Sequence, residues 1–343
     1  MGIASAGMYL PEKVLTSAEI AEASGLPEWV VRDKMGIHAK RMAGPADQPN
    51  DMAVWAVEDC LSKTDVRAEE IDVVLCTTEE WKEYLLWTAG IDLAYRIGAA
   101  RAWAVDVHMR CATTVAALKM AKDMMTADAE INTILIAGGY RVGDLINLKN
   151  TRTSFMFNIG AGAGALLLRR DWPRNQVLGT HMISDGYMSR HVVVPASGTL
   201  EFPRDRAVAE NRFTFDLVEP ELMKERLNAV SMDNWLRCVD EALRKSGNKP
   251  TGEPYTRDDV DFLNMVLVKP SGHRDMLQRL GLSEEQSVYL SEVGHIGEQD
   301  AIINMIAGEK LGRLKEGDLM AVISAGIGYV WGASMVKWGP TAP

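Results

Sequence analysis

The chain has 343 residues, of which 47% are hydrophobic and 24% charged, and its formal net charge at pH 7 is −10. These values are typical of a globular protein with a sizeable core, and the acidic balance argues against nucleic acid or an anionic membrane as the main partner. The sequence shows no basic leader, no paired cysteines and no apolar stretch near the roughly eighteen residues that a membrane helix needs, so it predicts a cytoplasmic protein with reduced thiols and no structural metal site.

Apolar runs alternate with helical patterns along the first half of the chain. The predicted elements are a strand over 71–76, a helix near 85–97, a strand over 103–107, a helix from Cys111 to Met120 and a strand over 133–139. Such alternation is typical of parallel strands that are joined by crossover helices. A glycine-rich strand over 160–168 follows, and the polar stretch 169–176 with its proline marks the end of this half.

The second half of the chain repeats the pattern of the first. Its predicted strands over 259–268 and 319–326 resemble the first and third strands of the first half, and 220–246 predict a long amphipathic helix or helix pair. A duplicated α/β fold is the simplest interpretation, with one domain over 1–170 and a second over 171–343.

Cys111 lies where an apolar run ends and an amphipathic helix begins. The free N–H groups and the positive dipole end of a helix stabilise a thiolate, which is the reactive form of cysteine, and an oxyanion formed beside it. A small buried hydrophobe is an equally good interpretation of this segment alone, because free cysteine is among the most buried residue types.

A second segment with chemical potential surrounds His295, which lies between two glycines ahead of a predicted helix over 301–306. Asp300 is close enough in sequence to reach back to the imidazole and fix its tautomer. Taken singly, such a histidine is more often structural, and such an aspartate is more often a helix N-terminal charge. Taken with Cys111, the two residues predict a nucleophile, a base and an orienting acid, with Cys111 and His295 on different domains.

Several short motifs, spread over nearly the whole chain, occur in the same order as in a known protein family. They are Tyr9-Leu10-Pro11 with Glu28-Trp29-Val30-Val31 and Met35-Gly36-Ile37, Asp106 to Cys111, Phe157 to Ala163, and Gly326 to Gly332. On these motifs the chain resembles β-ketoacyl-ACP synthase III relatives in the thiolase superfamily. The resemblance implies a five-layered αβαβα thiolase fold with two duplicated halves, a homodimer built through the sheet of the first half, and a narrow tunnel that admits a pantetheine arm to the cysteine.

Two departures from the family pattern bear on the reaction. Condensing members carry a histidine in a P-H-Q-A-N motif and an asparagine in a G-N motif, and both stabilise a thioester enolate. Lys269 stands at the first place here and His295 at the second. Without two neutral donors, decarboxylative condensation loses its electrostatic stabilisation. The G-H-x-G-x-x-D pattern instead resembles the non-condensing acyltransferase branch, which uses a Cys or Ser, His and Asp set.

The function that this resemblance implies is acyl transfer through an acyl-Cys111 intermediate. The donor is an acyl-CoA or acyl-ACP thioester, and the acceptor is a hydroxyl, amine, thiol or water, in secondary or acyl-CoA metabolism. One alternative is a synthase or thiolase that forms or cleaves carbon–carbon bonds, against which stands Ser324, where thiolases keep a second cysteine. Another is a non-catalytic partner subunit of a heteromeric complex, against which stands the retained nucleophile.

Ligand contacts are carried over from the family residue by residue. Trp29 matches a tryptophan that stacks on the CoA adenine, and Arg152 lies near an arginine on the opposite face. Lys34 or Arg32 either meets the CoA phosphates or is a surface charge. Simple burial of Trp29 and a solvated charge at Arg152 are the alternatives. Further pocket candidates are Lys269, His108, Ser324 and Gly328. No metal and no permanently bound cofactor are expected, since coenzyme A or phosphopantetheine enters as substrate.

The segment Glu79-Glu80-Trp81 replaces a threonine-rich loop of the family. It either shapes specificity for the acyl group or the acceptor, or it is a solvated loop.

Overall fold

The computed structural model describes residues 1–196, 198–200, 209–210 and 212–340. Its strands are β1 (Gly2–Tyr9), β2 (Val14–Thr16), β3 (Ala39–Arg41), β4 (Val73–Cys76), β5 (Trp103–Asp106), β6 (Thr133–Tyr140), β7 (Gly162–Arg169), β8 (Arg174–Ser184), β9 (Val192–Val193), β10 (Asp216–Leu217), β11 (Phe262–Met265), β12 (Leu319–Gly326) and β13 (Val330–Pro340). Its α-helices are α1 (Ser17–Ser24), α2 (Pro49–Leu61), α3 (Ala89–Arg96), α4 (Thr113–Ala127), α6 (Pro220–Lys245), α7 (Pro270–Arg279) and α8 (Asp300–Lys310).

Within the described residues, nine strands form one mixed sheet in the order β11-β12-β13-β8-β1-β7-β6-β4-β5. The strands β1, β7, β6, β4 and β5 come from the first half of the chain, and β8, β11, β12 and β13 come from the second. The two groups meet where Gly2 of β1 pairs with Gln176 of β8. In the first group β6, β4 and β5 run parallel, and in the second group β11 and β12 run parallel; an antiparallel strand flanks each set. Parallel neighbours of this kind are what the alternating sequence pattern predicts.

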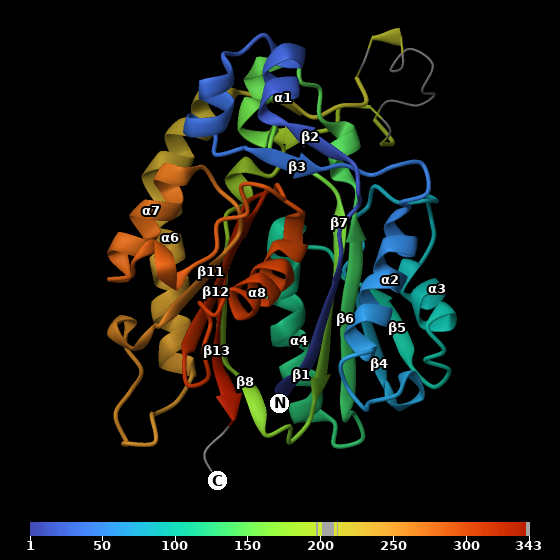
Figure 1. Ribbon diagram of the computed structural model, residues 1–343, viewed down its shortest axis with the longest axis vertical. Helices are drawn as coiled ribbons and strands as arrows, with labels where there is room; N and C mark the ends of the chain where they lie inside the picture. Colours follow the sequence, from blue (N-terminus) through green and yellow to red (C-terminus); the bar gives the residue numbers. More distant parts are fainter. Residues whose placement is uncertain (197, 201–208, 211, 341–343) are drawn as a thin grey trace.

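The described elements stack in five layers, which Figure 1 shows side by side. Helices α4 and α8 lie between the two groups of strands, because α4 packs on β6, β8 and β13 and α8 packs on β1, β7 and β11. Helix α6 covers the outer side of β8 and β13, and helix α2 covers the outer side of β1, β6 and β7. Both central helices therefore have protein on either side, which explains why their N-terminal ends are enclosed.

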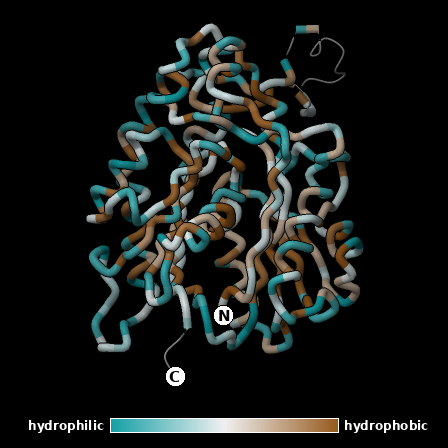
Figure 2. Tube along the Cα trace, in the orientation of Figure 1, coloured by the Kyte–Doolittle hydropathy of each residue, from teal (hydrophilic) through white to brown (hydrophobic). Residues whose placement is uncertain are grey.

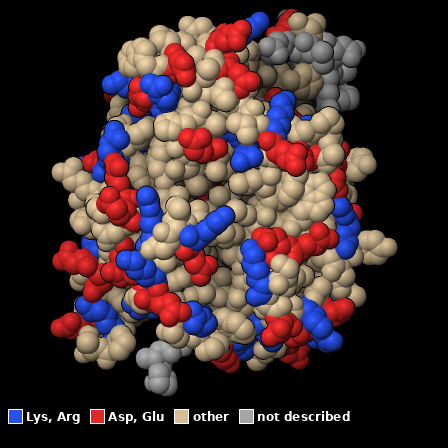
Figure 3. Space-filling model, in the orientation of Figure 1, with Lys and Arg blue, Asp and Glu red and all other residues tan. Residues whose placement is uncertain are grey.

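Hydrophobic residues are frequent along the strands and the helices beside them (Figure 2), and buried residues of this kind form the core. Strand β6 is buried at every position, from Thr133 to Tyr140, as is expected for a strand covered on both faces. Acidic and basic side chains are interspersed on the face that Figure 3 shows, without a large area of one sign. Among the described residues no helix is long and apolar enough to span a membrane.

Two predicted helices begin later than expected, and a third prediction is resolved in favour of one of its two alternatives. The helix expected near 85–97 begins only at Ala89. The helix expected from Cys111 begins at Thr113, because residues 110–112 form a 3₁₀ turn ahead of it. The helix or helix pair expected over 220–246 is one continuous helix, in which a proline occupies the first turn, where its missing N–H is not needed.

Helix α7 contains a buried histidine that gives the fold a specific acid sensitivity. His273 is 5% exposed, and its Nε2 lies 3.1 Å from the Oγ of Ser287. Since Ser287 donates its own proton to the carbonyl of Leu263, its Oγ accepts from His273, which fixes the neutral tautomer. Burial, and then the charge of Arg274, lower the pKa of His273 to about 4.

We therefore expect wild-type stability to fall as the pH drops from about 6.5 toward 4. In that range the unfolded chain binds a proton at His273 and the native state does not, so the free energy of unfolding decreases by up to about 1.4 kcal/mol per pH unit and by about 3 kcal/mol at pH 4. His273→Phe should remove this component. Urea unfolding at a series of pH values measures it, and equal pH dependence of the two proteins would contradict the assignment.

Candidate active site

Cys111 is positioned by the connection between β5 and α4. Two hydrogen bonds of the Thr113 hydroxyl hold the loop after β5 in place. Its Oγ1 accepts from the N–H of Met109 at 2.7 Å and donates to the carbonyl of Arg110 at 2.6 Å. Arg110 has a positive φ of 53°, an uncommon conformation for a non-glycine residue. Cys111 follows in the 3₁₀ turn, half-buried, at the N-terminal end of α4.

His295 is held by backbone bonds on both of its sides. Its N–H donates to the carbonyl of Asn158 at 2.8 Å, and its own carbonyl accepts from the N–H of Gly160 at 2.9 Å. The preceding Gly294 has φ +86°, and a Cβ there would lie 2.8 Å from the carbonyl oxygen of Asn158 and 2.6 Å from the Cβ of Lys40. Only glycine fits this turn, which presents the imidazole toward Cys111.

The three residues of the predicted set form one hydrogen-bonded chain. The Sγ of Cys111 lies 3.1 Å from the Nε2 of His295, and the Nδ1 of His295 lies 2.6 Å from the Oδ2 of Asp300. Asp300 also accepts from the backbone N–H groups of Leu267 at 2.9 Å and Ile296 at 2.7 Å. These bonds leave the carboxylate no freedom to turn away, and it is 1% exposed. The imidazole is thus oriented from one side and contacts the thiol from the other.

The charges of the Cys111–His295–Asp300 set favour a protonated imidazole. Burial alone would lower the pKa of His295, but the charges of Asp300 and Cys111, with the hydrogen bonds to both, raise it well above its usual value. Loss of the negative charge on Cys111, as on acylation, would remove one of these causes. Burial, followed by the charge of Cys111, raises the pKa of the nearby Tyr140, which keeps this phenol neutral.

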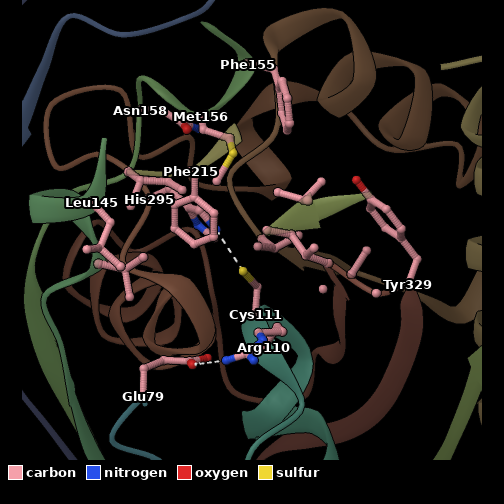
Figure 4. Close-up of a pocket in the computed structure, with 18 of the residues that line it drawn as sticks. Glu79, Arg110, Cys111, Leu145, Phe155, Met156, Asn158, Phe215, His295 and Tyr329 are labelled. Atoms are coloured by element: carbon pink, nitrogen blue, oxygen red, sulfur yellow. Dashed lines mark hydrogen bonds and ion pairs between the residues drawn. The ribbon is translucent and has the colours of Figure 1, made fainter. Parts of the chain in front are cut away.

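Cys111 and His295 open into a cavity of about 1180 Å³. Figure 4 shows Leu145 and Phe215 on one side of Cys111, Tyr329 on the other, and Arg110 with Glu79 below it. Most of the wall is apolar, with contributions from Val142, Leu145, Met156, Phe215, Trp235 and Trp331. A cavity of this size and character suits a ligand with a substantial apolar group.

The other sequence-predicted residues fall into those that line the cavity and those that do not. Lys269, Lys34 and Gly328 line the cavity. Exposed Trp29 and Arg152 do not line it, and Arg152 donates to the carbonyl of Leu217 instead. No contact of Lys269 with Cys111 is present among the described residues, so the lysine does not occupy the place of His295 against the thiol.

Two of the pocket candidates, His108 and Ser324, do not line the cavity. His108, in the loop after β5, is exposed and is not among the residues that line the cavity. Ser324 is 3% exposed and lies behind Cys111 on β12, where its Oγ donates to the carbonyl of Cys111 at 2.5 Å. Ser324 therefore supports the nucleophile's backbone and does not line the pocket.

Removal of this support should have a moderate effect. We expect Ser324→Ala to slow acylation of Cys111 by about fivefold, since one buried hydrogen bond contributes about 1 kcal/mol. Rapid-mixing mass spectrometry of the Cys111 adduct measures the rate, and Ser62→Ala, on the exposed end of α2, is the matched control. An unchanged rate would show that the backbone of Cys111 needs no such contact.

Sequence reasoning gave no definite role to four polar residues around the site. Glu79 and Arg110 form an ion pair of 2.8 Å within the cavity wall. Asn158 lines the cavity, is 8% exposed, and its amide makes no hydrogen bond to any described residue. Lys40 is 1% exposed behind the His295 turn, where it donates to the carbonyl of Ile159, and burial lowers its pKa to about 8. Asn158 does carry a sequence signal, because the family motif has glycine there.

The part of the chain that the structure describes contains no candidate metal-binding site. No group of three or more His, Cys, Asp or Glu side chains among those residues is arranged to hold a metal ion.

Comparison with family models gives two matches along the chain. Residues 105–186, which include Cys111, match the model of 3-oxoacyl-[acyl-carrier-protein (ACP)] synthase III. Residues 252–338, which include His295 and Asp300, match the model of the C-terminal part of the same enzymes. The two matched segments thus contain all three members of the hydrogen-bonded chain.

Relatives align with almost the entire chain. The β-ketoacyl-[acyl-carrier-protein] synthase III of Caldanaerobacter subterraneus is 25% identical over 338 residues, which cover 98% of this chain and 97% of the relative. The crystal structure of the Thermus thermophilus synthase III superposes with a TM-score of 0.81 at 20% identity, covering 99% of this chain and all of that one (100%). A variant of Xanthomonas campestris OleA, crystallised with lauric acid and lauroyl-CoA, superposes with a TM-score of 0.78 at 20% identity and 98% coverage of both chains. The structural likenesses show a common thiolase fold.

Proposed function

We propose that this chain, which belongs to the β-ketoacyl-ACP synthase III-like proteins of the thiolase superfamily, is an acyltransferase that works through an acyl-Cys111 intermediate. The observation that carries the proposal is the hydrogen-bonded chain from Cys111 through His295 to Asp300 at the cavity. A thiol beside a base that is itself oriented by a carboxylate is the arrangement that nucleophilic acyl transfer requires.

In the first step the thiolate of Cys111 attacks the carbonyl carbon of an acyl-CoA or acyl-ACP thioester. A carbon–sulfur bond to Cys111 forms, and the bond to the pantetheine sulfur breaks. The leaving thiolate takes the proton of the His295 imidazolium, so acyl-Cys111 and a neutral imidazole remain. Backbone N–H groups near Cys111 and the Gly328 turn are the proposed donors to the oxyanion.

In the second step the neutral imidazole of His295 removes a proton from the acceptor, which attacks the acyl carbon. The Cys111–carbon bond breaks and the thiolate is regenerated beside an imidazolium. Because acylation has removed the negative charge of Cys111, one cause that raises the pKa of His295 is absent at this stage, and the imidazole is freer to act as a base. A hydroxyl, amine, thiol or water fits this requirement.

Carbon–carbon bond formation is the second candidate, because the relatives carry the name β-ketoacyl-[acyl-carrier-protein] synthase, which denotes a condensing enzyme. Against it stands the site: His295 is committed to Asp300 and Cys111, and Lys269 is an exposed side chain without a partner among the described residues. An enolate formed by decarboxylation would lack the two neutral donors on which it depends.

The proposed donor carries its acyl group on coenzyme A or on the phosphopantetheine of a carrier protein. Lys34 and Lys269, both exposed at the cavity, are suited to the phosphates of either, and Trp29 with Arg152 is the proposed adenine contact. OleA, a structural neighbour, was crystallised with lauroyl-CoA, and the apolar wall here suits acyl groups of that kind.

A homodimer is the proposed assembly. Strand β5 is at the edge of the sheet, and large apolar side chains near it are exposed, among them Trp103 at 50% and Tyr95 at 84%. An unpaired edge with exposed aromatic residues suits antiparallel pairing with a second copy. Analytical ultracentrifugation should give twice the chain mass.

The test of the function is intact-protein mass spectrometry after mixing with acyl-CoA donors of increasing length. We expect a mass increase that equals the acyl group in the wild type and none in Cys111→Ala, followed by loss of the adduct when alcohols, amines or thiols are added. Cys60→Ala, which removes a fully buried thiol outside the cavity, is the control that should still be acylated. Absence of an adduct from every donor would reject the proposal and favour the partner-subunit interpretation.

A further inference from the structure

An ion-paired cluster, Glu79–Arg110–Glu80, forms the polar part of the wall next to Cys111. One nitrogen of the Arg110 guanidinium lies 2.8 Å from Glu79, and the other lies 2.7 Å from Glu80. Glu79 is 5% exposed, whereas most of the Glu80 side chain is solvated. All three residues line the cavity, and Arg110 is the immediate neighbour of Cys111 (Figure 4).

The charges of this cluster do not cancel. One guanidinium faces two carboxylates, so the cluster has a net charge of about −1 when both carboxylates are ionised. Both nitrogen ends of Arg110 are already occupied. Burial alone would lower the pKa of Arg110, but the charges of Glu79 and Glu80 and the hydrogen bonds to both raise it above the usual range, which keeps the guanidinium charged. The second carboxylate oxygen of Glu79, Oε1, makes no hydrogen bond to any described residue, and it is not among the fully buried unpaired atoms.

The backbone supports this use of Arg110. The positive φ of Arg110 is a strained conformation for a side chain of this size, and such conformations persist where surrounding contacts hold them. The Cβ of Arg110 lies so close to Gly326 that a side chain there would approach it within 2.9 Å. The two ion pairs direct the guanidinium toward Glu79 and Glu80, and Figure 4 shows Arg110 on the side of Cys111 away from Met156 and Phe155.

The negative charge of Glu79 acts on the groups around Cys111. Burial, and then the charge of Glu79, raise the pKa of Glu298 well above its usual value. One oxygen of Glu298 is buried without a hydrogen-bond partner among the described residues, so no cation compensates there. Another anion beside Arg110 would meet the charge of Glu79 and find both nitrogen ends of the guanidinium already paired.

We propose that Glu79, by occupying Arg110, makes the cavity select against acyl groups that end in a carboxylate, so that the group carried by Cys111 is uncharged. This inference rests on the proposed acyl-Cys111 intermediate and adds the chemical class of the donor. Neutral straight or branched acyl groups are admitted by the apolar wall, while malonyl-like and succinyl-like groups are rejected by charge and not by size. Replacement of Glu79 by glutamine would release one nitrogen end of Arg110 for a substrate carboxylate.

The experiment compares acylation of Cys111 by three matched donors: butyryl-CoA, succinyl-CoA and the methyl ester of succinyl-CoA. Succinyl places a carboxylate where butyryl has a methyl group, and the ester restores neutrality at larger size. In the wild type we expect succinyl-CoA to react about 10²-fold more slowly than butyryl-CoA, and the methyl ester to react within about fivefold of butyryl-CoA.

The variants test the assignment to Glu79. In Glu79→Gln the ratio of the succinyl to the butyryl rate should rise at least about tenfold, and in Glu80→Gln, which removes the more solvated charge, about threefold. Glu309→Gln, an exposed position at the end of α8, should keep the wild-type ratio. If Glu79→Gln does not fold, as thermal unfolding will show, the Glu80→Gln ratio provides the same test at smaller amplitude.

Equal rates for succinyl-CoA and butyryl-CoA in the wild type would overturn the inference while leaving the acyl-enzyme proposal intact. So would a ratio that neither glutamine variant changes, or a methyl ester as slow as succinyl-CoA, which would assign the selection to size. Absence of a butyryl adduct in the wild type under conditions where no donor reacts would overturn the proposed function, and this inference with it.

Discussion

Replacement of His295 by alanine should slow both steps of acyl transfer, with discharge of acyl-Cys111 reduced about 10³-fold. The reason is that a positioned general base contributes about 10²–10⁴-fold, and His295 is the group within 3.1 Å of the thiol. The adduct formed with a reactive thioester should therefore accumulate and persist. Stopped-flow release of the donor thiol, combined with mass spectrometry of the adduct, separates the two steps.

Two controls distinguish loss of the base from loss of the fold. His181→Ala, on β8 and paired with Lys245, should keep the wild-type rates. Added imidazole should partly restore discharge in His295→Ala, because the vacated space adjoins the cavity. Lys269→Ala should change the rates by no more than about threefold if its role is limited to phosphate attraction. Unchanged turnover in His295→Ala, or its complete loss in Lys269→Ala, would move the proton-transfer role to the lysine.

Asp300→Asn should reduce turnover about 10²–10³-fold although Asp300 touches no substrate. The carboxylate accepts from His295, Leu267 and Ile296 at once, and an amide presents N–H where one of those donors needs an acceptor. The imidazole then loses its fixed tautomer. We also expect a loss of about 2 kcal/mol in the free energy of unfolding, because a buried donor is left unpaired.

The pH profile separates positioning from simple destabilisation. Asp300 raises the pKa of His295, and the discharge step needs the neutral imidazole, so discharge increases with pH through the pKa of His295. Removal of the carboxylate's charge lowers that pKa, and the midpoint of the discharge profile should move to lower pH in Asp300→Asn. Asp275→Asn, which breaks an exposed pair with Arg279, should leave the midpoint in place. A midpoint that does not move in Asp300→Asn would contradict the assignment.

The strands of the fold could be predicted from the sequence because buried parallel strands read as continuous apolar runs. Residues 133–139 and 319–326 were expected as strands and form β6 and β12 to within one residue. The five-layered thiolase fold was expected from the resemblance alone, and the structural neighbours confirm it. The start of α4 was misplaced by two residues, since nothing in the local sequence announces the 3₁₀ turn that contains Cys111.

The site was less accessible to sequence reasoning. Cys111 and His295 are separated by 184 positions, and only the family resemblance suggested that they meet. The hydroxyl of Ser324 donates to the carbonyl of Cys111 and does not face the pocket. Nothing in the sequence around Ser324 indicates which of these two arrangements it adopts. The Glu79–Arg110 pair depends on the unusual backbone of Arg110, which periodicity and propensity do not reveal. Long-range contacts of this kind are set by tertiary packing.

The central claim is that Cys111 passes an acyl group to a nucleophile without forming a carbon–carbon bond. It is tested most directly by loading Cys111 with a ¹³C-labelled acyl group, then adding either a panel of alcohols, amines and thiols or a malonyl carrier, and measuring adduct loss and carbon dioxide release together. The account predicts discharge to an oxygen, nitrogen or sulfur acceptor, or to water, with no carbon dioxide. Discharge that occurs only with the malonyl carrier, with one carbon dioxide released for each acyl group, would contradict it and establish condensation.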